Sequence, residues 1–310
     1  MAANTHRYQI AVLILETNVP IPEATTAEPS SQTAECRLEW MDSRAVVPKA
    51  TAPFHRWVDA AGKPFVWFYH REGGYQIRVR GIADFLVSSH AEEIRCYPRQ
   101  KIPAEIIRQL FLEVVLPAAL SRRGRLSLHA SAVATPGGVI GFLGGGGQGK
   151  STLAVGLSRR GFRLICDDSM VLKQERDRMV VVPELAGVRL WPDSVAVLLE
   201  QASHDLPVTN TEKRRFSRTG PAAEAMPLLR LYMLESSPDR DIKIEKLSPD
   251  DALVELIKCS HMLDITDKEL IRMKFNELTV ISNQIPCFRI EFPHDYSRLE
   301  ELCEVVTQDR

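Results

Sequence analysis

The chain has 310 residues, of which 45% are hydrophobic, and its 39 basic and 40 acidic residues leave a net charge of -1. This length is ordinary for two domains, and the composition supports a buried core. Because the balanced charge creates no global field to attract nucleic acid or an acidic membrane, we expect neither as a partner.

The cysteine and hydropathy patterns are typical of a cytoplasmic protein. The six cysteines are scattered, without a C-x-x-C pair or clustered histidines, which argues against a zinc site or a disulfide framework. The apolar stretch Ile10–Leu15 is too short for a secretory signal. The later stretch Leu110–Leu120 contains Glu113 and Pro117 and is too short to span a membrane. We therefore expect a soluble, cytoplasmic protein.

Residues 1–101 have the pattern of a small β-rich domain. Apolar and aromatic runs predict strands at Tyr8–Glu16, Phe65–Tyr69 and Tyr75–Val79, separated by glycine and proline turns. Pro20–Gln32 is rich in Pro, Thr, Ser and Ala, which predicts a loop.

Residues 102–310 form the second predicted domain, and its first element is a helix that bridges the two domains. Pro103 stands near the helix start, and apolar residues recur at helical spacing from Ile106 to Val114. We therefore expect a bridging helix over residues 102–123.

Strands and helices alternate after residue 125, which predicts an α/β fold. The predicted strands are Leu126–Ala134, Val139–Leu143, Arg163–Cys166, Met179–Val182, Leu228–Leu234, Ile242–Lys246 and Cys287–Phe292. Ser248 and Pro249 mark a helix start, because serine is a favoured N-cap and proline a favoured first helical residue. Helices are predicted at residues 249–260 and 266–279.

A glycine-rich run between a predicted strand and a predicted helix matches the phosphate-binding pattern G-x-x-x-x-G-K-[ST]. The candidate nucleotide-binding residues are Gly144, Gly145, Gly146, Gly147, Gln148, Gly149, Lys150, Ser151 and Thr152. Glycines let the main chain approach phosphates, and the N–H groups at the helix start carry partial positive charge. We expect Lys150 to reach the β- and γ-phosphates of ATP and Ser151 to bind Mg²⁺. The alternative is a flexible surface loop with a solvated lysine.

Two adjacent carboxylates, Asp167 and Asp168, end the apolar strand that follows this loop. One of them can bind Mg²⁺ while the other accepts a proton, a pairing typical of kinases. Adjacent negative charges also raise one pKa unless a cation lies nearby. The alternative is a turn or an N-cap pair, since such residues are common after a strand.

Three further features could contribute to the same site. His129 lies on the strand before that of the loop, where a hydrogen-bonded core histidine is the alternative. Glu184 could be a second carboxylate for the metal, or an ordinary loop residue. The run Lys213, Arg214 and Arg215 could clamp phosphate oxygens, or be a solvated charged run. It lies within Glu200–Ala225, a charged segment that is a candidate lid.

Together these residues resemble the catalytic domain of the HPr kinase/phosphorylase family. The family pattern has a histidine before a G-x-x-x-x-G-K-S loop, followed by R-G-[HF]-R-L-[IV]-x-D-D and a downstream E-x-x-G. The segment Arg160–Asp168 matches the D-D run almost letter for letter. The resemblance implies a P-loop kinase domain of the PEP-carboxykinase-like type. It also implies Asp168 as the proton acceptor with Asp167 as its acidic neighbour, His129 as an active-site partner, and Ser151 and Glu184 as Mg²⁺ ligands. We add Asp167 to the candidate metal ligands.

Other segments look more like the HPr-kinase-like enzymes of lasso-peptide gene clusters. The family's Glu-x-Arg-Gly motif reads Glu184–Gly187 here, with alanine in the place of the arginine. Gly187–Asp193 and Leu229–Tyr232 resemble the lasso-peptide branch, whose members phosphorylate the C-terminal serine of a precursor peptide. This resemblance implies an ATP-dependent serine kinase with a peptide substrate. HPr kinases are typically hexamers, which implies a homo-oligomer.

Two other functions fit the same residues. One is a kinase for a carrier protein or a small molecule, since the same loop would serve and only the acceptor pocket would differ. The other is a scaffold that binds a nucleotide without catalysis. Asp168 and Glu184 together disfavour the scaffold, because binding alone needs neither a base nor a second metal ligand.

Overall fold

The computed structural model describes residues 5–10, 12–26, 33–47, 50, 52–58, 62–183, 188–199, 214–216, 224–239 and 241–308. The chain divides into two units. The first contains Met1–Arg125 and Met262–Ile271, and the second contains Leu126–His261 and Arg272–Arg310. This division differs from the expected boundary between residues 101 and 102, because the helical segment that follows residue 102 belongs to the first unit.

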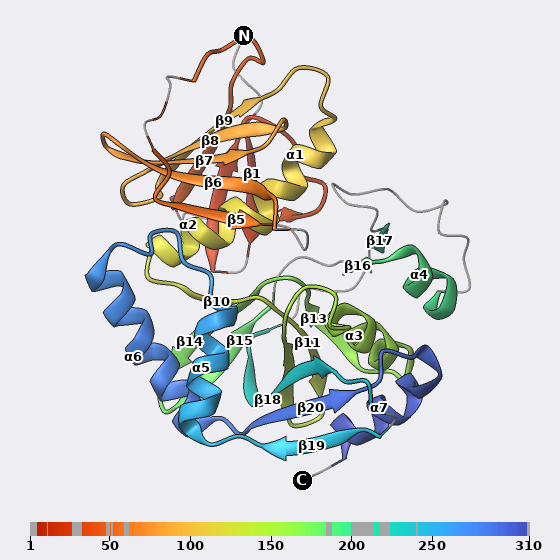
Figure 1. Ribbon diagram of the computed structural model, residues 1–310. Coiled ribbons are helices and arrows are strands. Elements are labelled where there is room, and N and C mark those ends of the chain that lie inside the picture. The colour runs from red at the N-terminus through yellow and green to blue at the C-terminus, as the bar shows by residue number, and fades with distance from the viewer. Residues whose placement is uncertain are drawn as a thin grey trace. The chain divides into compact units, whose positions relative to one another are not determined.

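The first unit is built on one mixed sheet (Figure 1). Its strands are β1 (His6–Ile10), β2 (Leu13–Thr17), β3 (Thr25–Thr26), β4 (Cys36–Trp40), β5 (His55–Val58), β6 (Pro64–Arg71), β7 (Gly74–Val79), β8 (Ala83–Ser88) and β9 (Glu93–Pro98). They are ordered β3-β1-β2-β4-β9-β8-β7-β6-β5, and β4 pairs in parallel with both β2 and β9.

The single strand predicted at Tyr8–Glu16 is a hairpin in the structure. Strands β1 and β2 pair antiparallel, with Ile10 opposite Leu13. The apolar run from Ile10 to Leu15 therefore folds back on itself, which pairs the backbone groups of both strands and buries Ile10, Leu13 and Leu15. Hydrophobic pattern alone does not distinguish this hairpin from one longer strand.

The predicted bridging helix is continuous but changes its winding. It consists of α1 (Ala104–Leu110), a π-helical turn (Phe111–Val115) and α2 (Leu116–Arg122). The wide turn comes just before Pro117, which lacks the N–H that a regular α-helix would donate to residue 113. Phe111 packs within the first unit, with its ring centroid 6.5 Å from that of Phe85. This packing explains why the helix belongs to the first unit.

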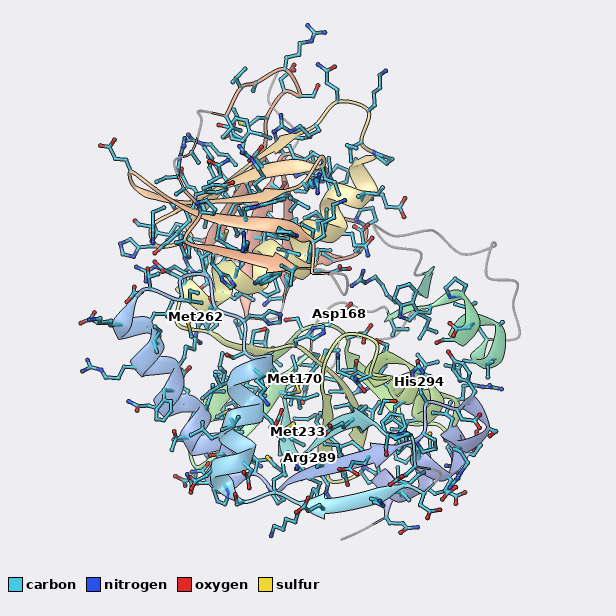
Figure 2. The ribbon with its side chains drawn as sticks, in the orientation of Figure 1. Asp168, Met170, Met233, Met262, Arg289 and His294 are labelled. Carbon is cyan, nitrogen blue, oxygen red and sulfur yellow. The ribbon has the colours of Figure 1, made fainter. Side chains whose placement is uncertain are left out.

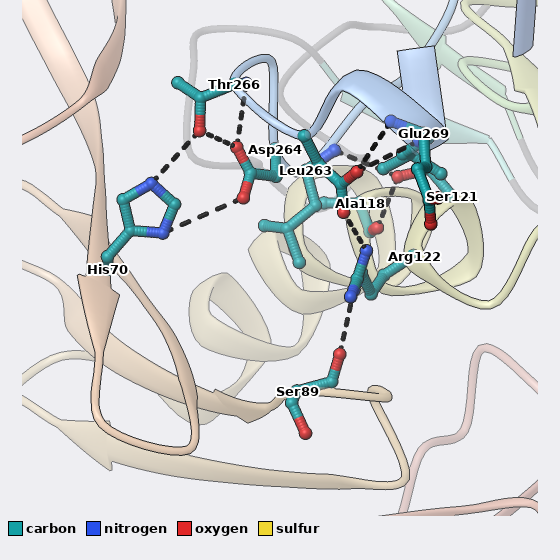
Figure 3. A network of polar contacts seen from close by, with 11 residues as sticks. His70, Ser89, Ala118, Ser121, Arg122, Leu263, Asp264, Thr266 and Glu269 are labelled. Atoms are coloured by element: carbon teal, nitrogen blue, oxygen red, sulfur yellow. Dashed lines mark hydrogen bonds and ion pairs between the residues drawn. The ribbon is translucent and has the colours of Figure 1, made fainter. Parts of the chain in front are cut away.

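Polar contacts attach residues 262–271 to the rest of the first unit (Figure 3). Leu263 N donates to Ser121 Oγ at 2.9 Å, and Arg122 Nη1 donates to Asp267 Oδ2 at 2.6 Å. His70 Nε2 lies 3.2 Å from Thr266 Oγ1. These contacts explain why a segment so far along the chain belongs to the N-terminal unit.

The second unit is a mixed sheet covered by helices on both faces (Figure 1). Its strands are β10 (Leu126–Leu128), β11 (Ala130–Thr135), β12 (Gly138–Leu143), β13 (Arg163–Cys166), β14 (Met170–Glu175), β15 (Arg178–Val182), β18 (Met226–Ser236), β19 (Lys243–Lys246) and β20 (Cys287–Phe292). The order is β10-β14-β15-β18-β12-β11-β13, and β20 joins β18 and β19. Strand β18 runs parallel to both β12 and β20.

A bend at His129 divides the single strand that the sequence predicts over Leu126–Ala134. Strand β10 before it pairs with β14, whereas β11 after it pairs with β12 and β13. Because each half has different neighbours, His129 cannot continue a regular ladder. The bend places this histidine at a break in the strand rather than within a strand.

The helices of the second unit are α3 (Lys150–Arg159), α4 (Pro192–Leu198), α5 (Pro249–Cys259), α7 (Leu299–Thr307) and most of α6 (Lys268–Gln284), whose first four residues belong to the first unit. Apolar side chains of α3 and α7 pack on one face of the sheet, and those of α5 and α6 pack on the other (Figure 1). Ser248 caps α5 as predicted, with its Oγ accepting from Asp251 N at 3.2 Å. The unit is therefore a mixed α/β structure, as expected.

A small ribbon outside the main sheet pairs β16 (Val188–Leu190) with β17 (Arg214–Phe216). In this antiparallel pair, Arg189 lies opposite Arg215. Most of the candidate lid, Glu200–Ala225, lies outside the described residues.

Candidate active site

The glycine loop, residues 144–149, connects β12 to α3 in the second unit. Gly144, Gly147 and Gly149 have φ angles of 142°, 82° and 80°, in the region that favours glycine. A Cβ on Gly144 would lie 2.6 Å from the carbonyl oxygen of Leu234, so the loop and β18 can approach this closely only without a side chain. Helix α3 begins directly after the loop, where its first N–H groups can bind an anion.

Lys150 is buried at the end of this loop, with 6% of its surface exposed. Its Nζ donates to the carbonyl oxygens of Gly144 and Gly145 at 2.8 and 2.9 Å. An ammonium group held by backbone carbonyls under a glycine loop is not a solvated surface charge. It can instead donate to phosphate oxygens brought to the loop.

Asp167 follows β13 and accepts hydrogen bonds through both carboxylate oxygens. Its Oδ1 accepts from Ser131 Oγ at 2.5 Å and from Ser151 Oγ at 2.8 Å, and its Oδ2 accepts from Arg189 N at 3.1 Å. Burial raises the pKa of Asp167, and the neighbouring charge of Asp168 raises it further, while these hydrogen bonds oppose the shift. The sequence analysis considers only the adjacent charge as a cause of a raised pKa, whereas burial is the larger cause.

Asp168 has a left-handed backbone, with a φ angle of 64°. Its Oδ2 accepts from Arg189 Nε at 3.1 Å and from Arg189 Nη2 at 2.9 Å, and its carbonyl oxygen lies 3.0 Å from His129 Nδ1. An L-residue in this conformation is strained unless its surroundings hold it, and such strain is common at functional sites. Figure 2 labels Asp168 in the second unit.

A cluster of buried polar side chains, centred on His261, lies next to His129. The ring centroids of His129 and His261 are 6.1 Å apart, and His261 Nδ1 lies 3.1 Å from Ser127 Oγ. Ser127 Oγ is in turn 2.8 Å from Ser169 Oγ. Burial lowers the pKa of His261 to about 3, and the nearby His129 adds to this effect. His261 is therefore neutral at physiological pH and can hydrogen-bond as a neutral ring.

A cavity of about 650 Å³ lies beside the glycine loop. It is lined by the glycine loop with the first turn of α3, by His129 and Asp168, and by residues 189–194 with His294 and Tyr296. Thr152 Oγ1 is 3.3 Å from Ser194 Oγ, which is 2.8 Å from the hydroxyl of Tyr296. Burial raises the pKa of Tyr296, so its hydroxyl remains protonated. The cavity is within the size range of small-molecule sites.

The structure brings several predicted site residues together, namely the glycine loop, Lys150, Ser151, Thr152, His129, Asp167 and Asp168. Glu184 and Lys213 lie outside the described residues. Arg214 and Arg215 are described by their backbone in β17, next to the strand that carries Arg189.

The sequence analysis did not identify Ser131, Arg189, Ser194 or Tyr296 as site residues. Ser131 has a local signal only in the single strand that the sequence predicts over Leu126–Ala134, where it lies two residues after His129 and on the same face. Arg189 has no such local signal. Its contact with Asp168 spans 21 residues and depends on where β16 lies.

Ser151 and Asp167 could hold a magnesium ion. The described residues contain no group of three or more His, Cys, Asp or Glu side chains arranged to hold a metal by themselves. Mg²⁺ does not need such a cage, because it commonly binds one or two protein oxygens together with phosphate oxygens and water. Ser151 Oγ and Asp167 Oδ1 are 2.8 Å apart and have the oxygen chemistry that this ion prefers.

All six cysteines lie in the described residues, and each is a free thiol, as expected from their scattered positions. Over the described part of the chain, no helix combines the length and apolarity needed to cross a membrane.

No protein-family model and no curated protein matches this sequence. Among solved structures, the HPr(Ser) kinase/phosphatase from Coxiella burnetii is similar at 14% sequence identity and a TM-score of 0.29. The match covers 58% of this chain and 93% of that chain. So loose a superposition supports no conclusion about fold or chemistry, and any inference about function has to come from the site residues themselves.

Proposed function

We propose that this chain is an ATP-dependent P-loop kinase that transfers the terminal phosphate of ATP to a serine hydroxyl. The observation that supports this proposal is the cavity of about 650 Å³ that the glycine loop, Lys150, Ser151 and Asp168 line together. A phosphate donor site and a carboxylate able to accept a proton are the two parts that hydroxyl phosphorylation requires.

In this proposal each group has a separate task. Lys150 and the first N–H groups of α3 bind the phosphates and stabilise the charge of the loose transition state. The acceptor hydroxyl attacks the terminal phosphorus. The bond between that phosphorus and the β-phosphate oxygen breaks, ADP leaves, and the hydroxyl proton moves to Asp168. Mg²⁺ bound through Ser151 and Asp167 would neutralise phosphate charge. Glu184, Arg214 and Arg215 remain candidates for a further metal ligand and for phosphate clamps.

The acceptor we propose is the C-terminal serine of a peptide, as in the lasso-peptide kinases that this sequence resembles. We also propose that the enzyme is cytoplasmic and forms a homo-oligomer.

The test is phosphoryl transfer by the full chain. The protein is incubated with ATP, Mg²⁺ and a synthetic peptide that ends in serine, and ADP release and the peptide mass are followed. We expect both ADP release and a phosphorylated peptide, and neither with the same peptide ending in alanine. Lys150→Ala should abolish both signals. Arg178 is an exposed basic residue of the same unit, and Arg178→Ala is the control that should leave both signals unchanged.

Other outcomes would redirect the proposal. ADP release that requires a carrier protein or a small alcohol, but no peptide, would support a kinase and contradict the peptide acceptor. Nucleotide binding without ADP release under any acceptor would contradict the kinase and favour the scaffold.

A further inference from the structure

Arg189 holds both carboxylates of the site. Its backbone N–H donates to Asp167 Oδ2 at 3.1 Å, and its guanidinium donates to Asp168 Oδ2 at 2.9 and 3.1 Å. Both partners are largely buried, with side-chain exposures of 12% for Arg189 and 15% for Asp168. The backbone contact anchors β16, so the guanidinium could leave Asp168 by side-chain rotation alone.

This ion pair conflicts with the role of Asp168 in the proposed reaction. Two guanidinium N–H groups engage Oδ2, and a cation this close to the carboxylate opposes transfer of a proton to it. Moving Arg189 away from Asp168 would break an ion pair between two largely buried side chains, which is costly. The exchange is therefore favourable only if another anion takes the guanidinium.

The terminal phosphate of ATP is such an anion. Arg189 lines the same cavity as the glycine loop and Lys150. A phosphoryl group has more negative charge than a carboxylate and accepts the planar guanidinium through two oxygens. Because the Arg189 side chain is largely buried, this difference in charge has a larger effect on it than it would in water.

We propose that Arg189 is a catalytic residue that moves from Asp168 to the γ-phosphate when ATP binds. The Arg189–Asp168 pair thus keeps Asp168 engaged until the phosphate donor is present. No covalent bond changes in this exchange, which only replaces one anion by another at the guanidinium. The inference rests on the proposed nucleotide site and adds to it a residue and an order of events.

The test measures nucleotide affinity rather than turnover. Dissociation constants for ADP and for the β,γ-imido analogue of ATP are determined by calorimetry, with Mg²⁺, for the wild type, Arg189→Ala, Asp168→Asn and the double variant. Arg189→Ala should weaken analogue binding about tenfold, the scale of one charge-assisted hydrogen bond, and leave ADP binding unchanged. The affinity of Arg189→Lys for the analogue should lie between those of the wild type and Arg189→Ala, because lysine keeps the charge without the paired donors.

The double variant separates exchange from simple repulsion. Asp168→Asn should strengthen analogue binding because it releases Arg189, and this gain should disappear when Arg189 is also replaced. If the gain persists in the double variant, Asp168 merely repels phosphate and the exchange is refuted. Equal effects of Arg189→Ala on ADP and the analogue would also refute it. Arg178→Ala should change neither constant, and thermal melts of every variant report whether it folds.

The design distinguishes two failures. If the wild type binds the analogue and Lys150→Ala does not, but Arg189→Ala binds it normally, the nucleotide site stands and the exchange falls. If the wild type binds neither nucleotide, the proposed function falls and the exchange falls with it.

Discussion

Each unit of this protein has an aspartate bound by arginine, and the two sites differ in backbone conformation, in surroundings and in access to a cavity. Asp84 in β8 is 1% exposed and accepts from Gln76 Nε2 at 2.6 Å, Arg78 Nε at 2.7 Å and Arg99 Nη2 at 2.9 Å. It lies in a regular ladder, directly opposite Arg78. Asp168 follows a strand, has a left-handed φ of 64°, and lines a cavity.

Under the proposed function, the same kind of ion pair would serve stability in one place and chemistry in another. The partners of Asp84 come from β7 and from the residue after β9, so the sheet itself positions them. The partner of Asp168 comes from the short strand β16, outside the main sheet, and its side chain faces a space that a ligand can fill. We therefore expect Asp84 to contribute to folding and Asp168 to contribute to the reaction.

The largest expected effect is on phosphoryl transfer. Asp168→Asn should reduce transfer by about 10²- to 10⁴-fold, because a general base contributes on that scale, and asparagine tolerates the left-handed backbone. Nucleotide binding should remain. Transfer within tenfold of the wild type, measured by ADP release, would refute the role of Asp168.

The second effect is on stability and tests the other half of the comparison. Asp84→Ala should lower the free energy of unfolding by about 3 kcal/mol, near the low end for a broken buried pair, because Arg78 and Arg99 can regain water. Urea unfolding measures this change, and turnover per folded molecule should not change. Glu93→Ala removes an exposed ion pair with Arg95 and should cost under about 1 kcal/mol. Equal costs for the two variants would contradict the assignment.

A third prediction concerns the glycine loop. Gly144→Ala should destabilise the loop by about 1–3 kcal/mol, because its φ is unfavourable for alanine and the new Cβ would meet the Leu234 carbonyl. Nucleotide affinity should fall accordingly. Gly137→Ala, outside the loop, is the control, since its Cβ would make only an ordinary contact with Leu229 at 3.5 Å. Calorimetry with ATP that ranks Gly137→Ala as the weaker binder would overturn this geometry.

A fourth prediction is the pH dependence contributed by His261. Its pKa is about 3 in the folded protein against 6.5 for the free side chain, so the unfolded chain binds more protons between these values. Its contribution to stability should therefore decrease as pH falls below about 6.5. His261→Gln removes this dependence, so the difference in unfolding free energy between variant and wild type should shrink between pH 7 and pH 4. A difference that does not change with pH would contradict the buried neutral histidine.

Much of the second unit was predictable because its signals are local. Strands β13 and β20 have the predicted bounds, and Ser248 caps α5 as expected. The strand, glycine loop and helix of residues 138–159 follow one another directly, so spacing alone predicts that they form a turn suited to phosphate. Lys150, Ser151 and the two aspartates were identified for the same reason.

The features that sequence reasoning missed depend on distant partners. The β1–β2 hairpin, the bend at His129 and the membership of residues 104–122 in the first unit follow from which strands and helices pack together. Periodicity describes one element at a time and contains no information about its neighbours.

By itself, the sequence determined the glycine loop, the α/β class of the second unit and the carboxylates that follow β13, because each is encoded within a few adjacent residues. Only the tertiary structure decided that Arg189 binds Asp168, that Ser131 and Ser151 share Asp167, and that Arg189, Asp168 and Ser151 line one cavity. These contacts join residues 16 to 36 positions apart in the chain. The charge of a side chain determines which kinds of partner it can bind, but only the fold determines which of those partners lies close to it.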